Sequence, residues 1–342
     1  MSGTVTAHPR ICLNMIVRNE AHVVAELLDS VAPYISSWVI VDTGSDDGTQ
    51  ELIRAHMDRL GIPGELYERP WRDFGTNRTQ ALTLAQGHGD YIWVMDADDV
   101  VVGTPDFTQL DADVYTMRNK ITTPDGYAPI IWSPQLFRDG LRMRFEGATH
   151  EQVACDEPHV SKRLEGDYHI EYRHLGSRSL DPESSAQNRD LLLAAVERNP
   201  DDSNAVMHLA QTYFQLGDFA SARKWYERRT VMGGSNELVY HAMCQIASSM
   251  GSGGAPWPDV QDALLRAWEF RPTRAETLHA IAAGSAAKSG TSALRSRLDT
   301  GCISARTGGS SHPTTSSPAS PRCSRPNQRC SRSASTSPTR PY

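Results

Sequence analysis

Apolar runs and short polar clusters alternate along the first part of the chain. Runs at residues 11–17, 38–41 and 91–95 predict buried strands. Helical periodicity over residues 21–32 and from residue 51 onward predicts a helix after each of the first two strands. Strands that alternate with helices through short Gly- and Asp-containing connections indicate an α/β domain with a largely parallel sheet.

Each of these strands ends in a polar cluster, at residues 18–20, 42–49 and 96–99. In such sheets the ligand crevice lies outside the carboxyl ends of the strands, so we expect the clusters to share one site. Unpaired buried carboxylates are costly, so the acids must meet a cation, water or a ligand. Asp-x-Asp at a strand end suits Mg²⁺ or Mn²⁺ carrying phosphate oxygens, although by itself it is as often a capped turn or a solvated loop.

Three motifs together resemble family 2 glycosyltransferases, which have the GT-A nucleotide-sugar fold. They are Met-Ile-Val-Arg-Asn-Glu at residues 15–20, Val-Asp-Thr-Gly-Ser-Asp-Asp-Gly-Thr at 41–49 and Met-Asp-Ala-Asp-Asp at 95–99. The resemblance covers roughly residues 10–178. It implies a metal-dependent, inverting, hexosyltransferase-type enzyme that moves a sugar from a nucleoside-diphosphate sugar to an acceptor hydroxyl, with Mn²⁺ or Mg²⁺ as cofactor. The acceptor, whether a glycan, a lipid or a protein, stays open.

The resemblance also implies roles for individual residues on the donor side. The residues expected to bind the nucleotide are Asn19, Glu20, Asp42, Asp47, Arg78 and Asp96. Asp42 is expected to contact the base and Asp98 to ligate the cation, with Asp96 near the ribose or the metal's water shell. Asp99 is an alternative ligand, because the run of acids leaves the register of the motif open. Residues 168–174 alternate as a strand does, and His174 resembles the late-strand His that completes the metal shell in many such enzymes. A hydrogen-bonded strand His without a metal is the alternative.

Arg78 has two interpretations. Residues 71–78 resemble the family's segment between the third strand and the Asp-x-Asp strand, where an Arg faces the nucleotide. A guanidinium fork matches phosphate geometry, so Arg78 is a candidate contact for the diphosphate. The alternative is an Arg near a helix start that pairs with Asp73.

The second half of this domain is less regular. Short strands are predicted at residues 114–117, 130–132 and 136–138. Loops such as residues 122–129 are expected to determine the choice of acceptor.

The stretch Phe-Glu-Gly-Ala-Thr-His-Glu at residues 145–151 resembles the family's His-Glu pair near the acceptor entrance. An inverting transferase needs a carboxylate that takes the acceptor's proton, so Glu151 is the candidate base and His150 its neighbour or substitute. A surface Glu without a role is the alternative. A zinc protease is excluded, because the second His four residues after His150 is missing.

From about residue 180 the pattern changes to paired helices. Small and aromatic residues between Leu209 and Tyr226 match tetratricopeptide spacing. The pairs Ala195/Pro200 and Ala267/Pro272 repeat that motif's closing small residue and helix-ending Pro. Such stripes serve packing first, and a protein partner on the repeats is a second interpretation. Family 2 glycosyltransferases with appended helical repeats are a familiar arrangement, so the fusion agrees with the resemblance.

We therefore expect a GT-A domain over residues 1–178, tetratricopeptide-like repeats over 179–283 and a tail over 284–342. The tail is rich in Ser, Thr, Pro, Gly and Arg and is expected to be disordered, or else a sequence artefact. It holds nine Lys/Arg and one Asp, so residues 1–283 carry a net charge of about −15. This acidic body argues against nucleic-acid binding.

The remaining composition favours a cytoplasmic protein. No apolar run reaches the roughly 18 residues of a membrane span, and the N-terminus lacks the pattern of a signal peptide. The six Cys are scattered without a Cys-x-x-Cys pair, which favours free thiols in a reducing compartment.

A second class of function stays open. The chain could be a scaffold or interaction protein, whose repeats bind a partner while the GT-A domain binds nucleotide without catalysis. The three intact motif clusters favour the enzyme. The short acceptor half and the irregular C-terminal region favour the scaffold.

Overall fold

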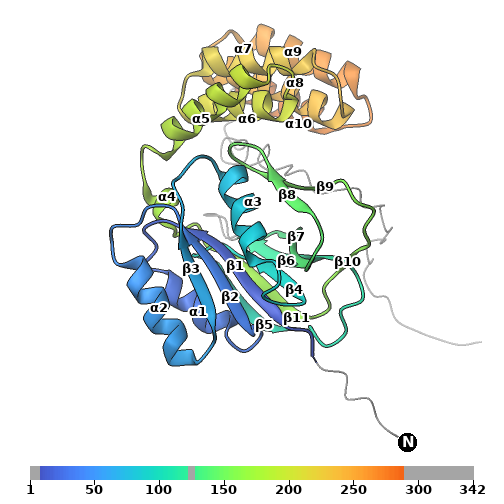
Figure 1. Cartoon of the computed structure of the whole chain (residues 1–342). Helices are drawn as coiled ribbons and strands as arrows, with labels where there is room; N and C mark the ends of the chain where they lie inside the picture. The colour runs from blue at the N-terminus through green and yellow to red at the C-terminus, as the bar shows by residue number, and fades with distance from the viewer. Residues whose placement is uncertain (1–7, 122–127, 289–342) are drawn as a thin grey trace, which may run out of the picture. The chain divides into compact units, whose positions relative to one another are not determined.

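The computed structural model describes residues 8–121 and 128–288. Most of the predicted acceptor loop at residues 122–129 and the tail from residue 289 onward lie outside the described residues. An α/β region comes first along the chain and a run of helices follows it (Figure 1). This order confirms the expected fold class.

The α/β region begins with alternating strands and helices and continues mainly as strands. Its elements are β1 (Ile11–Val17), α1 (Val24–Val31), β2 (Ser37–Asp42), α2 (Thr49–Leu60), β3 (Gly64–Glu68), α3 (Phe74–Ala85), β4 (Tyr91–Val94), β5 (Val100–Pro105), β6 (Val114–Ile121), β7 (Ile130–Arg138), β8 (Met143–Glu146), β9 (Gln152–Cys155), β10 (Ser161–Arg163), β11 (Gly166–Tyr172) and the short helix α4 (Ser177–Leu180).

The main sheet is mixed and mostly parallel, with the strand order β3-β2-β1-β4-β7-β6-β11-β5. β3, β2, β1 and β4 are parallel neighbours, whereas β7 is antiparallel to both β4 and β6. β11 and β10 are parallel to β6, and β5 is antiparallel to β11. Because β1, β2 and β4 are parallel neighbours, their carboxyl ends meet at one edge of the sheet. The three polar clusters follow those ends.

Both faces of the parallel half are covered by helices, which explains its continuous apolar runs. Side chains of β1 alternate between the two faces: Leu13 packs in a cluster with α1 and α2, and Cys12 packs in a cluster with Leu82 and Ala85 of α3. All three helices therefore hold the strand ends in place from both sides. The candidate site is built on the most buried part of the domain.

Two local predictions were wrong. Residues 130–132 and 136–138 form one strand, β7, because the chain continues through Pro134 with a change of register opposite residues 115–116. His174 was predicted to lie inside a strand, but it lies outside β11, which ends at Tyr172.

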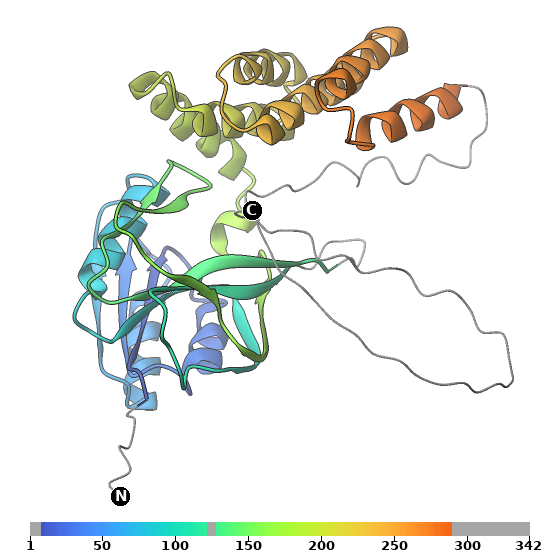
Figure 2. The same ribbon diagram turned by 90° about the vertical axis from the view of Figure 1, so that its right-hand side faces the viewer.

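The helical region contains α5 (Ser184–Arg198), α6 (Ser203–Gln215), α7 (Phe219–Thr230), α8 (Asn236–Ser252), α9 (Trp257–Phe270) and α10 (Glu276–Lys288). Each helix packs against the next one along the chain (Figure 2). Buried Ala210, Ala222 and Ala242 lie between helices and let their backbones approach. α10 continues to Lys288, beyond the expected boundary at residue 283. In the part of the chain that the structure describes, no helix has the length and apolar character needed to span a membrane.

Candidate active site at the strand ends

The loops after β1 and β2 are joined by hydrogen bonds. Asn19 accepts from the backbone N–H of Asp46 at 2.9 Å, and its own N–H donates to the Ser45 hydroxyl at 2.9 Å. Asn19 has a φ of 58°, a left-handed conformation that Asn tolerates better than most residues. The N–H of Glu20 donates to the Thr49 hydroxyl at 2.8 Å. The first two polar clusters therefore form one continuous surface.

Asp47 fastens the same junction from the side of α2. Its carboxylate accepts from the backbone N–H of Ala21 at 3.1 Å and from that of Thr49 at 3.0 Å. Partial burial opposes ionisation, but the hydrogen bonds from Thr49 and Ala21 outweigh it and hold the pKa of Asp47 below its usual range. The carboxylate of Asp47 is thus hydrogen-bonded within the loop, which supports a structural role for this residue.

Asp42 ends β2 and is almost completely buried, at 1% exposure. Its Oδ1 accepts from the N–H groups of Gly44 and Ser45 at 2.8 and 2.9 Å and from the Gln50 side chain at 3.0 Å. Its Oδ2 has no hydrogen-bond partner among the described residues. A buried carboxylate with one oxygen fully engaged and one vacant is a costly arrangement that a hydrogen-bond donor from a ligand would relieve.

The acids after β4 are held in different ways. Oδ2 of Asp98 accepts from the N–H groups of Leu175 and Gly176 at 2.7 and 2.9 Å. Asp99 is 1% exposed, and its Oδ1 has no partner among the described residues. Burial, together with the charges of Asp96 and Asp98, raises the pKa of Asp99 well above its usual range. Asp99 therefore favours the neutral acid.

Glu20 connects the first cluster to the third. Its carboxylate accepts from the backbone N–H of Ser177 at 3.2 Å. Burial raises the pKa of Glu20 to about 7, and the nearby charges of Asp98 and Asp96 act in the same direction. This carboxyl therefore belongs to the same electrostatic environment as the Asp-x-Asp acids.

Arg78 lies between two carboxylates that come from different segments of the chain. It pairs with Asp96 through Nη2 and with Glu151 through Nε, and its side chain is only 11% exposed. Burial would lower the pKa of Arg78, but the two carboxylates outweigh it and raise the pKa. The alternative pairing with Asp73 does not occur in the structure. Asp73 instead caps α3 by accepting from the N–H of Thr76 at 2.7 Å.

Residues 12–107 match the family model "Glycosyl transferase family 2". The N-terminal region is thus similar to family 2 glycosyltransferases. A TPR repeat-containing protein from Synechococcus elongatus is 28% identical over 259 residues, which cover 70% of this chain and 62% of that protein. The chain thus spans less than two thirds of that relative. Together these matches confirm the resemblance to a family 2 domain followed by tetratricopeptide-like helices.

Solved structures with a similar arrangement include two glycosyltransferases. Residues 1–349 of S. aureus TarS in complex with UDP-GlcNAc are 14% identical, with a TM-score of 0.40, and the match covers 82% of this chain and 92% of that one. The mannosyltransferase PcManGT from Pyrobaculum calidifontis, in complex with GDP-Man and Mn²⁺, is 16% identical with a TM-score of 0.39, covering 82% and 81%.

The acids of the family 2 domain suit a metal ion that arrives with its ligand. Within residues 8–121 and 128–288, no three His, Cys, Asp or Glu side chains converge as a ready metal cage. Asp96 is engaged by Arg78, and one oxygen of Asp98 by backbone N–H groups. Mg²⁺ in nucleotide sites is commonly held by one or two carboxylates together with substrate phosphates and water. The donor set fits that mode.

The two histidines expected in the site share a left-handed backbone conformation. His150 and His174 have φ values of 53° and 56°, and both are exposed. His174 lies beside Asp98, because the next two N–H groups bind that carboxylate, and its ring meets Tyr172 edge-on with centroids 4.6 Å apart. His150 immediately precedes Glu151. Both assignments stay predictions.

Backbone groups of residues 175–177 are the part of the site that sequence reasoning missed. They bind Asp98 and Glu20 through N–H groups, which carry no side-chain signature. The Leu-Gly pair after His174 was the available signal: a side chain at Gly176 would meet the carboxyls of Glu20 and Asp98 at 3.3–3.4 Å. A larger residue at this position would require those two carboxyls to shift by a few tenths of an ångström.

Proposed function

We propose that the chain is a metal-dependent, inverting glycosyltransferase that uses a nucleoside-diphosphate sugar. The observation that carries the proposal is the double ion pair of Arg78, which joins Asp96 of the Asp-x-Asp motif to the candidate base Glu151. These residues come from three separate segments: α3, the loop after β4 and the connection between β8 and β9. Convergence on one buried guanidinium is expected where donor and acceptor must meet.

The donor would lie across the ends of β1, β2 and β4. The vacant Oδ2 of Asp42 is suited to accept an N–H from the base, and the joined loops around Asn19 would support the nucleoside. Asp98, with Asp96 beside it, would hold Mn²⁺ or Mg²⁺ against the diphosphate, and His174 is the candidate for a further ligand. When bound, the cation would neutralise charge on the diphosphate and make it a better leaving group.

The transfer step itself would fall to Glu151. Its carboxylate would take the proton of the acceptor hydroxyl while the acceptor oxygen attacks the anomeric carbon. The bond between that carbon and the diphosphate oxygen would break, and the nucleoside diphosphate would leave with the bonding electrons. Attack from the face opposite the leaving group inverts the anomeric centre. Arg78 would hold Glu151 in place and supply positive charge near the departing diphosphate.

The alternative is an interaction protein whose family 2 domain binds nucleotide without turnover. The repeats, and the name of the S. elongatus relative, point in that direction. Nothing in the arrangement of Arg78, Asp96 and Glu151 requires loss of catalysis, so we place the enzyme first.

The test is a donor-hydrolysis screen of UDP-, GDP- and dTDP-sugars with Mn²⁺ that measures released nucleotide. We expect one donor class to be hydrolysed, and we expect release to stop with EDTA and in the Asp98→Asn variant. Asp58→Asn is the control, because Asp58 is an exposed acid on α2. Calorimetric binding of nucleotide without release from any donor would support the interaction protein. Nucleotide release at the wild-type rate by Asp98→Asn would mean that the acids after β4 form an ordinary turn and bind no cation.

A further inference from the structure

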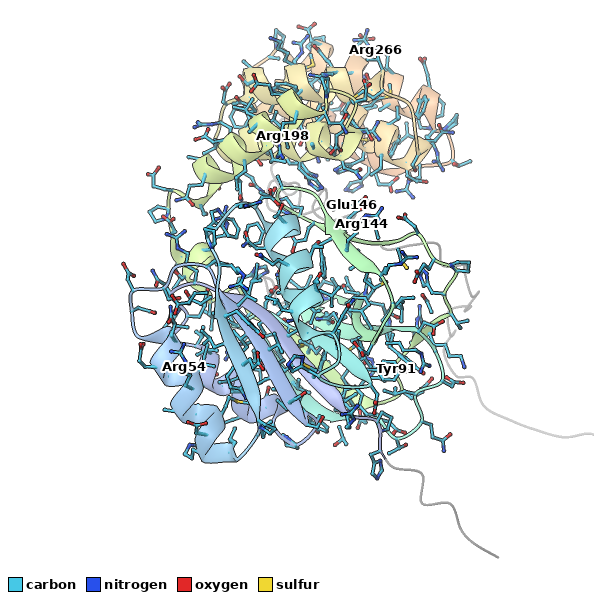
Figure 3. The ribbon with its side chains drawn as sticks, viewed as in Figure 1. Arg54, Tyr91, Arg144, Glu146, Arg198 and Arg266 are labelled. Carbon is cyan, nitrogen blue, oxygen red and sulfur yellow. The ribbon has the colours of Figure 1, made fainter. Side chains whose placement is uncertain are left out.

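The hairpin β8–β9 is a small sheet of its own and packs on α3. Phe145 and Val153 lie against the cluster that contains Leu82 of that helix. The outer side of the hairpin carries ion pairs: Arg144, labelled with Glu146 in Figure 3, contacts Glu146 and Asp156. The candidate base Glu151 lies in the connection between the two strands of this hairpin.

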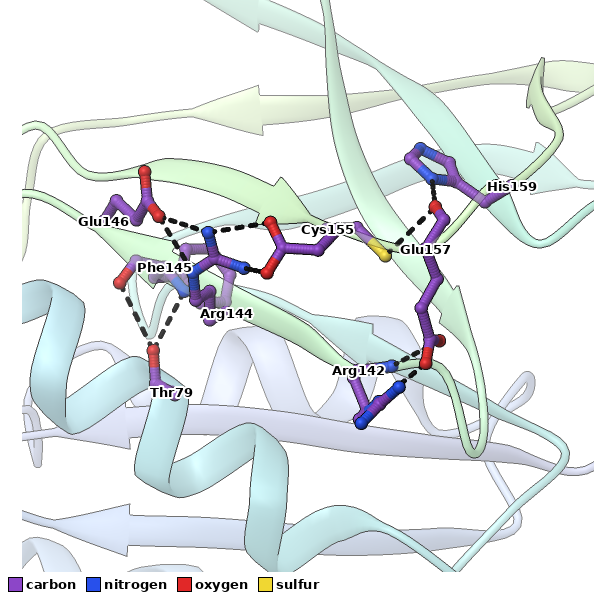
Figure 4. Close-up of polar contacts among 9 residues, drawn as sticks. Thr79, Arg142, Arg144, Phe145, Glu146, Cys155, Glu157 and His159 are labelled. Atoms are coloured by element: carbon purple, nitrogen blue, oxygen red, sulfur yellow. Dashed lines mark hydrogen bonds and ion pairs between the residues drawn. The ribbon is translucent and has the colours of Figure 1, made fainter.

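Thr79 joins α3 to the hairpin by a reciprocal pair of hydrogen bonds. Its hydroxyl accepts from the N–H of Phe145 at 2.9 Å and donates to the carbonyl of the same residue at 3.3 Å (Figure 4). A side chain in the second turn of α3 thus makes hydrogen bonds with the backbone of Phe145 of the kind that a neighbouring strand would make. The contact lies one residue beyond Arg78.

The first turn of α3 makes two more bonds, to the connection between β8 and β9. The N–H groups of Phe74 and Gly75 donate to the carbonyls of Ala148 and Gly147, each at 3.1 Å. N–H groups in the first turn of a helix lack partners within the helix, so these bonds satisfy donors that need an external acceptor. The connection that carries Glu151 is therefore fastened to α3 on both sides of Arg78.

Gly75 permits this close approach. A Cβ at that position would lie 2.6 Å from the carbonyl oxygen of Gly147 and 2.9 Å from that of Phe145. Both neighbours are backbone atoms, which cannot move aside as the end of a flexible side chain can. Any larger residue at position 75 would push the connection away from the helix.

We propose that Gly75 and Thr79 are positioning residues, which set where the Glu151 carboxylate lies relative to Arg78 and the donor. This proposal rests on the proposed function, since it gives Glu151 the part of the base. A base must be held within a narrow range of geometries, and misplacement by about 1 Å can cost roughly 100-fold in rate. An ion pair alone leaves the flexible side chains of Arg78 and Glu151 free to move together, whereas the backbone bonds fix the connection itself.

The experiment compares Thr79→Val, which keeps the shape but removes the hydroxyl, with Thr79→Ser, which keeps the hydroxyl. Thr83→Val is the matched control, because the Thr83 hydroxyl bonds only within α3, to the carbonyl of Thr79 at 2.8 Å. The readouts are kcat and KM for hydrolysis of the donor found in the screen, and hydrogen exchange of residues 145–151. Gly75→Ala serves as a second, independent variant.

We expect kcat to fall roughly 10- to 100-fold in Thr79→Val, with KM and the affinity for UDP and Mn²⁺ nearly unchanged. Thr79→Ser and Thr83→Val should retain kcat, and amide exchange of residues 145–151 should be faster in Thr79→Val and Gly75→Ala alone. Wild-type kcat in Thr79→Val, or equal losses in Thr79→Val and Thr79→Ser, would overturn the proposal. A fall in stability with kcat intact would reduce Thr79 to a structural residue.

Failure of the proposed function has a different signature, namely no nucleotide release by the wild type from any donor. Hydrogen exchange then still decides whether Thr79 and Gly75 hold the connection. Unchanged exchange of residues 145–151 in both variants would overturn the positioning role without any activity measurement.

Discussion

The α/β region and the helical region bury charge in different ways. Among the described residues, the α/β region buries Asp42 and Asp99 almost completely, both at strand ends that meet at one edge. The helical region buries Arg229, at 1% exposure, inside a helix pair. Buried charge is costly in both places. At the end of β4, Asp99 lies among Asp96, Asp98 and Arg78, whereas Arg229 lies where the tetratricopeptide pattern needs only packing.

Arg229 shows what the repeat pattern tolerates. It follows Ala195 by one repeat length, at the position where the motif has a closing small residue. Its Nη1 donates to the carbonyl of Gly233 at 2.9 Å, and its Nε has no partner among the described residues. Burial lowers the pKa of Arg229. The comparison teaches that a buried charged residue indicates a ligand site only where other charged side chains lie close to it.

The largest effect is expected for the base. Glu151→Gln keeps the hydrogen bond from Arg78 but removes the proton acceptor, so turnover should fall roughly 10²- to 10⁴-fold. Donor affinity should barely change, because the carboxylate is expected to face the acceptor. The measurement is nucleotide release under saturating donor, with water in the place of the acceptor.

Glu146→Gln is the control for this variant, since Glu146 lies on β8 of the same hairpin and its side chain is 57% exposed. Loss of donor binding in Glu151→Gln would move Glu151 to the diphosphate side. Near-normal turnover would transfer the role of base to His150 or another acid.

The two buried arginines should respond in opposite ways to replacement by Met. Arg78→Met leaves Asp96 and Glu151 without their cation, and we expect it to lower the free energy of unfolding by about 3 kcal/mol. Arg229→Met removes a buried charge that has no carboxylate partner among the described residues, and we expect a gain of about 1 kcal/mol. Urea denaturation followed by circular dichroism measures both. If Arg229→Met lowered the free energy of unfolding as much as Arg78→Met does, the two regions would not differ in how they bury charge.

The smallest effect concerns pH. The pKa of Glu20 is about 7 in the folded chain, against an ordinary value of 4.5. The folded state therefore holds this proton over a range in which the unfolded state has released it. The stability that results is complete below pH 4.5 and is lost as the pH rises to about 7. In EDTA, Glu20→Gln should show a flatter dependence of the unfolding free energy on pH across that window; identical slopes in both proteins would contradict the assignment.

Sequence patterns predicted the parts of the fold that depend on continuous burial. The runs at residues 11–17 and 91–95 became β1 and β4, because strands covered on both faces must be apolar throughout. β10 escaped prediction because all its residues are exposed and it has no apolar pattern. The prediction of two strands at residues 130–132 and 136–138 missed that β7 continues through Pro134, because the change of register there depends on the partner strand β6.

The sequence predicted which residues lie in the candidate site but not which of them contact one another. Arg78 had two possible partners on sequence grounds, and the local one, Asp73, proved to be a helix cap. One of its two carboxylate partners, Glu151, is distant in sequence, so this pairing follows from the packing of the β8–β9 hairpin on α3, which no periodicity encodes. The backbone donors of residues 175–177 were equally out of reach, because every residue type except Pro carries an N–H.

Those same backbone donors determine how the two regions can be separated by genetic engineering. The N–H groups that bind Asp98 and Glu20 belong to Leu175, Gly176 and Ser177, which is the first residue of α4. The candidate site therefore extends to Ser177. A shortened chain that ended at Tyr172, the last residue of β11, would lose these N–H groups although the main sheet was complete. Exchange of the helical region for that of another protein should therefore splice after α4, between Leu180 and Ser184.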